Sequence, residues 1–419
     1  MQLVEQHRID CRDPRGQAID AAAFASKNLY NAALYLTRQA FIHYHRVIPY
    51  EDLARELKAT DEYRALPAKV AQWVLKQVAL AWKSYFAACA AWEADPSRFL
   101  GHPKLPKYLD KLGRAAGRLL TYTEQATSRA PHNRGYVVPS GLEIRVETRQ
   151  TAIDQVRIVP HASHYTVEVI YERLVTPADV DPAHVAAIDI GLNTLAAVTT
   201  NQPSVTPFLV QGRPLKALNQ WYNKRRARLQ AKLPQGVFVS RQLDILADKR
   251  GRQINHYLHV ASRQIVDWLV AQRSGTLIIG KNDGWKQAIG LGKRTNQNFV
   301  FVPHARFIQM LQYKAELVGI QVLVSEESYT SKCSFLDLEP IGKHEVYAGK
   351  RIKRGLFRAR DGRCLNADVN GAYNILRKVV PDAFGNGIAG VVVHPVRIAL
   401  MNGPHGSNVH CAWNYAKEE

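Results

Sequence analysis

Val-Ala-Ala-Ile-Asp-Ile-Gly-Leu-Asn-Thr-Leu-Ala-Ala-Val, residues 185–198, is the most informative stretch of the chain. Two apolar runs flank a short segment that contains Gly191, a pattern that predicts a buried strand, a tight turn and a second strand. The first run contains one acid, Asp189. An acid in a buried strand is costly unless it is paired or binds a metal. Asp189 is therefore the first candidate functional residue.

Downstream of this stretch, strand and helix patterns alternate. We expect strands at 185–190, 194–199, 206–210, 276–279 and 320–324, and helices at 214–232, 240–272, 304–317 and 368–376. Three early strands followed by helix, strand, helix, strand and helix match the order of an RNase H-like α/β fold. In such sheets, polar groups at the carboxyl ends of central strands form the site.

The N-terminal half has a different pattern. A short strand over residues 1–14 precedes helical spacing within 17–95, and short alternating runs from 119 to 174 predict strands. The strand runs are 137–139, 142–146, 156–159 and 165–171. We expect a helical bundle and a small β-domain that the N-terminal strand completes, with a linker at 176–183.

Asp368 is the second candidate acid, at the start of the helix pattern Asn366–Leu376. Asp is also common in the first turn of a helix, so a purely structural role is an equally good interpretation. Asn370 and Asn374 are four residues apart, and their amides should share one face of this helix.

The third acid should follow the strand at 276–279, but the chain reads Gly280-Lys281-Asn282 there. The next strand is followed by Glu326 and Glu327. Because adjacent strands lie about 4.8 Å apart, a longer carboxylate from that strand could reach the same metal. A surface turn is the alternative interpretation. Three carboxylates would suit two Mg²⁺ ions, which prefer oxygen ligands.

The charge of the chain indicates a polyanionic partner. There are 56 Lys and Arg against 36 Asp and Glu, a formal net charge of +20 with a pI of about 9.8. Nucleic acid is the favoured partner, although an ordinary basic protein could have the same composition. The sequence contains no apolar run of about 18 residues, so we expect no membrane span. Five scattered cysteines indicate a cytoplasmic protein without a disulfide framework.

The candidate nucleic-acid contacts are basic, aromatic and amide side chains in helical or turn-rich segments. From composition and position they are Lys76, Lys104, Lys107, Tyr108, Lys224, Arg225, Arg226, Lys281, Asn282, Trp285, Lys350, Arg351, Lys353 and Arg354. A solvated surface is the alternative interpretation for each group.

Cys333 and Cys364 test for a zinc site. Structural zinc sites use four ligands, usually as two close pairs, and each of these cysteines stands alone. We therefore do not expect zinc. The segment around them should instead be held by packing of Phe335, Leu336, Tyr347 and Phe357.

Three motifs together resemble the TnpB proteins of insertion sequences, relatives of the type V CRISPR effector nucleases. They are Asp189-Ile190-Gly191-Leu192-Asn193, Tyr329-Thr330-Ser331-Lys332-Cys333-Ser334 and Ala367–Leu376. The resemblance implies an RNA-guided DNA endonuclease that uses Mg²⁺, a guide RNA and double-stranded target DNA beside a short motif. Asp189 matches the family's first catalytic Asp and Asp368 its last. Gln125 and Arg157 lie in further shared stretches and are added to the nucleic-acid contacts.

The resemblance also implies a domain plan. A β-barrel wedge domain would comprise residues 1–14 and 113–180, with a helical recognition domain at 15–112 inserted into it. A RuvC nuclease domain would follow at 181–419 with a degenerate zinc-ribbon-like insertion at about 328–366.

One departure from the family matters for activity. The usual catalytic Glu follows the fourth strand, where this chain has Gly280. Either the Glu has moved to Glu327 or Glu326, with Glu327 preferred, or the chain is a nuclease-inactive RNA-guided repressor. A guide-independent accessory nuclease is a third hypothesis. We favour the displaced glutamate, because both Asp residues are retained.

Overall fold

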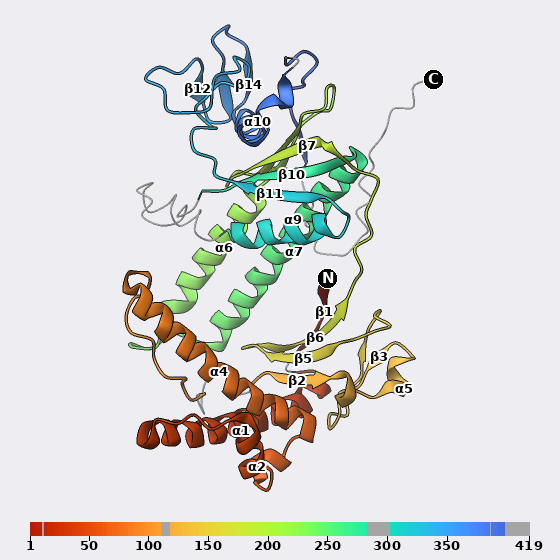
Figure 1. Ribbon diagram of the computed structural model, residues 1–419, viewed down its shortest axis with the longest axis vertical. Helices are drawn as coiled ribbons and strands as arrows, with labels where there is room; N and C mark the ends of the chain where they lie inside the picture. Colours follow the sequence, from red (N-terminus) through yellow and green to blue (C-terminus); the bar gives the residue numbers. More distant parts are fainter. Residues whose placement is uncertain (11, 110–117, 283–301, 386, 399–419) are drawn as a thin grey trace. The chain divides into compact units, whose positions relative to one another are not determined.

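The computed structural model describes residues 1–10, 12–109, 118–282, 302–385 and 387–398, which form two compact units (Figure 1). The N-terminal unit comprises Met1–Arg173 and Val239–Ile245, and the C-terminal unit comprises the remainder from Leu174. Among the described helices, none is long and apolar enough to cross a membrane.

The helices of the N-terminal unit match the predicted helical segment. They are α1 (Pro14–Tyr44), α2 (Tyr50–Leu57), α3 (Asp61–Arg64) and α4 (Ala68–Ala94), with a short α5 (Arg129–His132) further along. The start of α1 is fixed locally, because Asp13 accepts a hydrogen bond from the Arg15 amide and Pro14 occupies the first helical turn.

The sheet of this unit has four strands in the order β1-β6-β5-β2. Their bounds are β1 (Gln2–Asp10), β2 (Leu120–Thr123), β5 (Gln155–Pro160) and β6 (His164–Glu172). Strand β1 pairs antiparallel with β6 from Gln2 opposite Glu172 to Asp10 opposite His164. The prediction that the N-terminal strand completes this sheet is confirmed.

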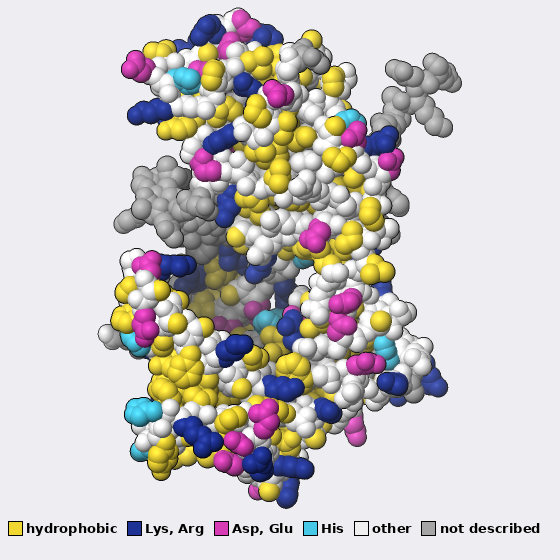
Figure 2. Space-filling model, in the orientation of Figure 1, with side chains coloured by type: hydrophobic (Ala, Val, Ile, Leu, Met, Phe, Trp, Pro, Cys, Tyr) yellow, Lys and Arg dark blue, Asp and Glu magenta, His cyan; other side chains and the backbone are white. Residues whose placement is uncertain are grey.

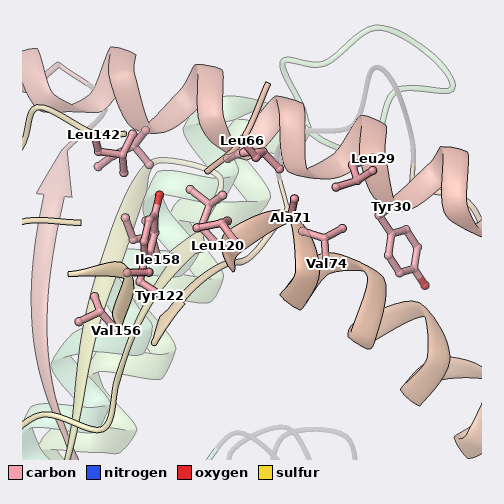
Figure 3. Close-up of a cluster of buried hydrophobic side chains, with 14 of the residues drawn as sticks. Leu29, Tyr30, Leu66, Ala71, Val74, Leu120, Tyr122, Leu142, Val156 and Ile158 are labelled. Carbon is pink, nitrogen blue, oxygen red and sulfur yellow. The ribbon is translucent and has the colours of Figure 1, made fainter. Parts of the chain in front are cut away.

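Helices and sheet of this unit share one core. Leu29 of α1 and Val74 of α4 lie with Leu120, Val156 and Ile158 of the strands in a single buried cluster (Figure 3). The predicted strand at 142–146 is mostly wrong, because only its last residue belongs to a strand. The short pair found there is β3 (Tyr136–Val137) with β4 (Val146–Glu147). The predicted alternation of buried and exposed side chains is nevertheless present, since Leu142 and Ile144 are buried.

The C-terminal unit contains a six-stranded sheet in the order β11-β10-β7-β8-β9-β15. The strands are β7 (Asp181–Ile190), β8 (Thr194–Thr200), β9 (Phe208–Gln211), β10 (Ser274–Gly280), β11 (Gln321–Ser325) and β15 (Val396–Ile398). Strands β7, β8 and β9 pair antiparallel, and β10 and β11 continue the sheet parallel to β7. The predicted linker at 176–183 overlaps the start of β7, and β15 was not predicted.

Helices cover both faces of this sheet (Figure 1). They are α6 (Arg213–Gln230), α7 (Arg241–Ala271), α9 (His304–Glu316) and α10 (Ala367–Val379). Ala186 and Ile188 pack in a cluster with residues of α7 and α9, whereas Ala187 packs in a second cluster with residues of α10. Because side chains alternate along a strand, Asp189 shares the α10 face with Ala187.

A small lobe, residues 328–366, precedes α10. It contains an antiparallel sheet of β12 (Lys350–Lys353), β13 (Leu356–Arg358) and β14 (Cys364–Asn366), which was not predicted. The predicted packing is confirmed for Phe335, Leu336 and Phe357, which are buried. Tyr347 is only partly buried and packs edge-on against the His344 ring at the lobe surface.

Candidate functional site

The carboxyl ends of three parallel strands meet at one edge of the C-terminal sheet. Ile188 of β7 lies beside Ile279 of β10, and Gly280 lies beside Ser325 of β11. Asp189 comes directly after Ile188, the last residue of β7 that pairs with β10, and therefore lies at the level of Gly280. Glu327 follows the end of β11 by two residues, at the same edge.

Asp189 faces α10 at a glycine. A Cβ added at Gly371 would lie 2.5 Å from Asp189 Oδ2, closer than real contacts allow. Gly371 therefore leaves room for the Asp189 carboxylate. Asp368 lies one helical turn earlier on α10, which brings both acids to the same end of the helix.

Asp368 is held by two side chains. Thr194 Oγ1 of β8 donates to Asp368 Oδ2 at 2.7 Å, and Arg351 Nη2 of β12 donates to Oδ1 at 3.3 Å. Asn366 caps α10 by accepting from the Asp368 and Val369 amides. Sequence analysis did not identify Thr194, whose only distinguishing feature is its place directly after the β7–β8 turn.

Glu327 fills the space that Gly280 leaves. A Cβ at Gly280 would lie 2.7 Å from Glu327 Oε2 and 2.5 Å from Ile375 Cδ1. Asn282 Nδ2 donates to Glu327 Oε1 at 3.0 Å, whereas Oε2 is buried and has no hydrogen-bond partner among the described residues. Glycine at the end of β10 and a glutamate after β11 are thus sterically linked.

The three acids are coupled electrostatically. Burial raises the pKa of Asp189 well above its usual range, and the nearby Glu327 and Asp368 carboxylates raise it further, while Arg351 opposes the rise. Burial also raises the pKa of Glu327 to about 7. Acids with raised pKa values that lie close together are typical of functional sites.

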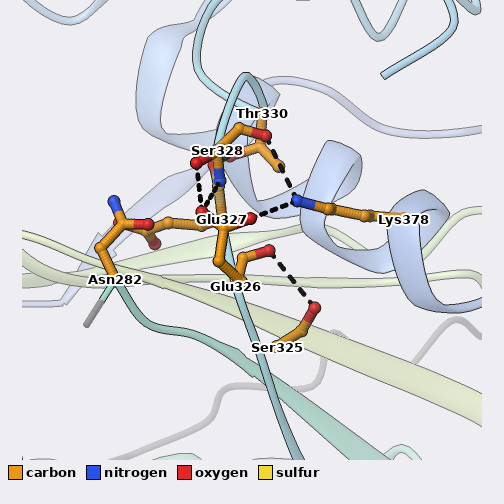
Figure 4. A network of polar contacts seen from close by, with 7 residues as sticks. All are labelled: Asn282, Ser325, Glu326, Glu327, Ser328, Thr330 and Lys378. Carbon is orange, nitrogen blue, oxygen red and sulfur yellow. Dashed lines mark hydrogen bonds and ion pairs between the residues drawn. The ribbon is translucent and has the colours of Figure 1, made fainter. Parts of the chain in front are cut away.

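Glu326 has a different environment. Its carboxylate is about half exposed, accepts from Lys378 Nζ at 2.7 Å and bonds the Ser328 amide at 2.7 Å (Figure 4). The hydrogen bond from Lys378 lowers the pKa of Glu326. The structure therefore places Glu327 beside Asp189, whereas Glu326 pairs with Lys378.

The segment that carries Glu327 is fastened to α10. Thr330 Oγ1 donates to the Glu327 carbonyl at 2.8 Å, and Asn374 Nδ2 donates to the Thr330 and Cys333 carbonyls at 2.9 and 2.7 Å. Asn370 Nδ2 also bonds the Cys333 carbonyl. The predicted shared face of the two amides is confirmed, and its role is to position this turn.

The donor set fits a hard divalent cation in its chemistry. Asp189, Glu327 and Asp368 offer carboxylate oxygens, which Mg²⁺ prefers, and Glu327 Oε2 lacks a protein partner in the described structure. Among the residues that the structure describes, no group of three or more His, Cys, Asp or Glu side chains lies close enough together to coordinate one metal ion. Asp368 is instead turned to Thr194 and Arg351.

The basic candidates of the C-terminal unit divide into two groups. Exposed residues are Lys224, Arg225 and Arg226 on α6, Lys281 after β10, and Lys350 and Lys353 on β12. Arg351 contacts Asp368. With the Asn193 amide turned so that its oxygen faces Arg354, that oxygen accepts from Arg354 Nε and Nη2 at 2.8 and 2.9 Å. Asn282 holds Glu327, a role that the sequence did not suggest. Trp285 lies outside the described residues.

In the N-terminal unit, Lys76, Lys104, Lys107, Tyr108 and Gln125 are exposed. Lys76 lies over the Trp73 ring, and Arg38 lies over the Tyr108 ring. Arg157 differs because it pairs with Glu168 at 2.9 Å across the sheet. A groove between α4 and the strands is lined in part by Trp73, Gln77, Arg118, Gln155 and Arg157. On the face shown in Figure 2, Lys and Arg are scattered among acids.

The cysteines of the lobe contact backbone carbonyls. Cys333 Sγ lies 3.6 Å from the Gly342 oxygen, and Cys364 Sγ lies 3.7 Å from the Gly362 oxygen.

Comparison with known families confirms the resemblance to TnpB proteins. The probable transposase family OrfB_IS605 matches residues 163–286, and the Cas12f1-like TNB domain matches residues 304–375. The TnpB-like protein ORF457 of Acidianus two-tailed virus is 24% identical over 417 residues, covering 90% of this chain and 84% of the viral protein.

Solved structures of similar proteins include two RNA-guided effectors. A Cas12f1–sgRNA–target DNA complex aligns with a TM-score of 0.37 and 15% identity, covering 89% of this chain and 98% of that protein. The mini-RNA-guided endonuclease CRISPR-Cas_phi3 aligns with a TM-score of 0.46 and 10% identity, covering 91% and 92%.

Proposed function

We propose that this TnpB-like chain is an RNA-guided DNA endonuclease whose third catalytic acid is the displaced Glu327. One observation carries the proposal: Asp189, Glu327 and Asp368 lie at the carboxyl edge of one sheet, where burial and then the two neighbouring carboxylates raise the pKa of Asp189. Three acids gathered at that edge, offset only in part by Arg351, reduce the stability of the fold, so their presence points to a functional role.

The fold supports a nuclease domain of the RNase H-like RuvC type. Three antiparallel strands followed by two parallel strands are the order that such a domain requires. We extend the proposal to the domain plan of wedge segments at 1–14 and 113–180, a recognition domain at 15–112, and a nuclease domain from 181.

Guide RNA and double-stranded target DNA are the proposed partners, in the cytoplasm of a prokaryotic cell and at its nucleoid. A net charge of +20 suits two polyanions. The solved Cas12f1 complex contains an sgRNA and target DNA. Trp73, Arg118 and Arg157 in the groove of the N-terminal unit combine aromatic and cationic groups, which suit contact with DNA beside the target.

The chain's own residues prepare the site for Mg²⁺. Asp189, Glu327 and Asp368 would hold the cations, which act as Lewis acids on the phosphodiester when bound. Thr194 orients Asp368 through Oδ2, and Asn282 orients Glu327 through Oε1. Glu327 Oε2 is left without a protein donor in the described structure.

The test uses the chain purified with its copurifying RNA, matched target DNA and Mg²⁺. We expect the wild type to cut, and we expect Glu327→Gln to be on the order of 10³-fold slower. Glu326→Gln is the matched control and should cut at the wild-type rate, because Glu326 is exposed and paired with Lys378. Equal rates for both variants would disprove the displaced glutamate, and no cutting with any divalent metal would disprove the nuclease.

A transplant sharpens this test. Glu327→Ala with Gly280→Glu would return the acid to the end of β10, and Ile375→Val would remove the Cδ1 atom that a Cβ at 280 meets at 2.5 Å. We expect this triple variant to regain part of the activity that Glu327→Ala loses. Gly280→Gln in the same background is the control and should regain none.

A nuclease-inactive RNA-guided repressor is the second candidate. The ion pair of Arg351 with Asp368 favours it, because this contact satisfies an acid without a metal. A repressor would bind matched target DNA with its RNA and leave both strands intact in every divalent metal.

A further inference from the structure

An exposed tyrosine near the candidate acids has a backbone conformation that favours glycine. Tyr329, two residues after Glu327, has a φ of 68°, in the left-handed region that non-glycine residues rarely adopt. A Cβ in this region crowds the backbone, so a bulky residue there lowers stability. Residues held in such conformations cluster at functional sites. A glycine would fit this backbone better, so the presence of a tyrosine points to a role for its ring.

The turn that carries Tyr329 is held through its backbone. The Thr330 amide donates to the Glu327 carbonyl at 3.2 Å, which puts Tyr329 at the third position of a β-turn. The Tyr329 carbonyl accepts from the amides of Lys332 and Cys333 at 3.0 and 3.1 Å. A glycine at position 329 would keep all of these hydrogen bonds. The phenol side chain is therefore not what fixes the turn.

The ring of Tyr329 is also not packed into the lobe. The residue is 38% exposed, and among the described residues its hydroxyl has no hydrogen-bond partner and its ring stacks on no other ring or cation. In contrast, Phe335 of the same lobe is buried and stacks on Tyr373 of α10, with ring centroids 4.3 Å apart. Tyr329 thus presents an aromatic surface to solvent, close in the chain to a candidate metal ligand.

A nucleobase is the chemical group that this surface fits. The net charge of +20 attracts a strand of nucleic acid to the chain. Exposed aromatic side chains bind unpaired bases by stacking, whatever the sequence, because every base has a π-face. A phosphodiester held at the acids would bring its own bases to within one nucleotide of them, which is the region that Tyr329 occupies.

We propose that Tyr329 stacks on an unpaired base of the DNA strand, beside the phosphodiester that the three acids would cleave. This inference rests on the proposed nuclease function. Stacking would fix the position of the strand along the site. The left-handed conformation then has a physical reason, because it holds a ring at a point of the turn where the backbone alone favours glycine.

Replacement by glycine separates the ring from the turn. Tyr329→Gly removes the ring together with the Cβ that crowds the backbone, so its melting temperature should equal or exceed that of the wild type. Single-turnover cleavage of matched target DNA by the RNA-loaded chain should fall about 10- to 10²-fold, as expected for the loss of one stacked base. A side chain with a purely structural role would not give these two results together.

Matched variants complete the cleavage experiment. Leu338→Gly is the control from the same lobe, because Leu338 also has a positive φ, of 47°, and is 39% exposed. It should cut at the wild-type rate. Tyr329→Asn has no ring but tolerates a positive φ, so it should cut as slowly as Tyr329→Gly. Tyr329→Phe keeps the ring and should recover most of the rate that Tyr329→Gly loses.

A fluorescent base reports the contact itself. 2-Aminopurine replaces, one position at a time, the bases that flank the wild-type cleavage site, and the chain carries Asp189→Asn so that the DNA stays intact. The fluorescence of this base falls when it stacks. At one position we expect the signal to be about twofold higher when Tyr329→Gly is added. Adding Leu338→Gly should leave the signal unchanged at every position.

Three results would overturn the inference. One is a Tyr329→Gly variant that cuts as fast as Leu338→Gly. A second is a Tyr329→Gly variant that cuts slowly and also melts at a lower temperature, which would make the ring part of the fold. The third is 2-aminopurine fluorescence that is the same at every position with and without the ring. A wild type that never cuts would instead overturn the proposed function itself.

Discussion

Glu5 in the N-terminal unit and Glu327 in the C-terminal unit are both partly buried glutamates beside a β-sheet, and their surroundings differ. Glu5 Oε2 accepts from Thr148 Oγ1 and Gln150 Nε2, both at 3.0 Å. Burial alone would raise the pKa of Glu5, but these hydrogen bonds hold it below its usual value. Among the described residues, the Glu327 carboxylate accepts from one side chain, Asn282, and burial raises its pKa to about 7.

The difference separates an acid that stabilises the sheet from one that we propose holds a cation. The N-terminal sheet satisfies its acids internally, as the pairing of Arg157 with Glu168 also shows. The edge of the C-terminal sheet gathers three acids and offsets them in part with one exposed arginine. The first arrangement stabilises the fold, whereas the second costs stability and leaves carboxylate oxygens free for a cation.

The largest expected effect is at Asp189. If the proposed function holds, Asp189→Asn should slow DNA cleavage by about 10³-fold or more, since it removes one of the three proposed metal carboxylates. The same change should leave the melting temperature equal or higher, because it relieves repulsion with Glu327 and Asp368. Cleavage assays and differential scanning calorimetry test both parts. Asp179→Asn, at an exposed position, is the control and should cut normally. A lower melting temperature for Asp189→Asn would contradict the comparison.

The next effect is at Gly280, which makes room for Glu327. Gly280→Ala places a Cβ 2.7 Å from Glu327 Oε2, so the carboxylate must move. We expect cleavage to fall about tenfold, the equivalent of about 1.4 kcal/mol. Gly251→Ala, a helical glycine whose Cβ would meet nothing within 4 Å, is the control. Full activity in Gly280→Ala would show that Glu327 does not depend on this space.

Glu5 should show the reverse balance. Glu5→Gln weakens the hydrogen bonds from Thr148 and Gln150, so the free energy of unfolding should fall by about 1 kcal/mol. The rate of DNA cleavage, measured well below the melting temperature of the variant, should be unchanged. Urea denaturation measures the stability, and Glu147→Gln, at an exposed position on β4, is the control. A large loss of cleavage without destabilisation would assign Glu5 a functional role.

The last effect concerns the stability of the fold alone, at a buried cation. Lys314 Nζ of α9 donates to the His259 carbonyl and Ser262 Oγ at 2.7 Å, and burial lowers its pKa from 10.5 to about 8. Between these values the unfolded chain binds more protons than the folded chain, so the free energy of unfolding should rise with pH from about 8 to about 10.5. We expect a slope of at most about 1.2 kcal/mol per pH unit, reached midway between these values, that Lys314→Met lacks. Denaturation of both proteins across this range tests it.

Sequence patterns predicted long elements well and short ones poorly. The expected helices at 240–272 and 304–317 and the strands at 185–190 and 194–199 are present, because their periodicity extends over several turns or a whole buried strand. The short strands β12 to β15 were missed, since three or four residues do not establish a period. The sequence favoured Glu327 over Glu326 only weakly, because two adjacent glutamates after the same strand are equally able to approach Asp189 until the conformation of the turn is known.

By itself, the sequence determined the alternation that buries β7, the cost of an acid at Asp189 and the excess of positive charge. These are local or additive properties, so a linear pattern contains them. The tertiary structure decided which residues meet that acid. The pairing of Gly280 with Ser325, the glycine at 371 and the turn held by Asn374 bring Glu327 to the site and leave Glu326 in solvent. Such contacts join residues far apart in the chain, and their distances depend on packing that no local pattern encodes.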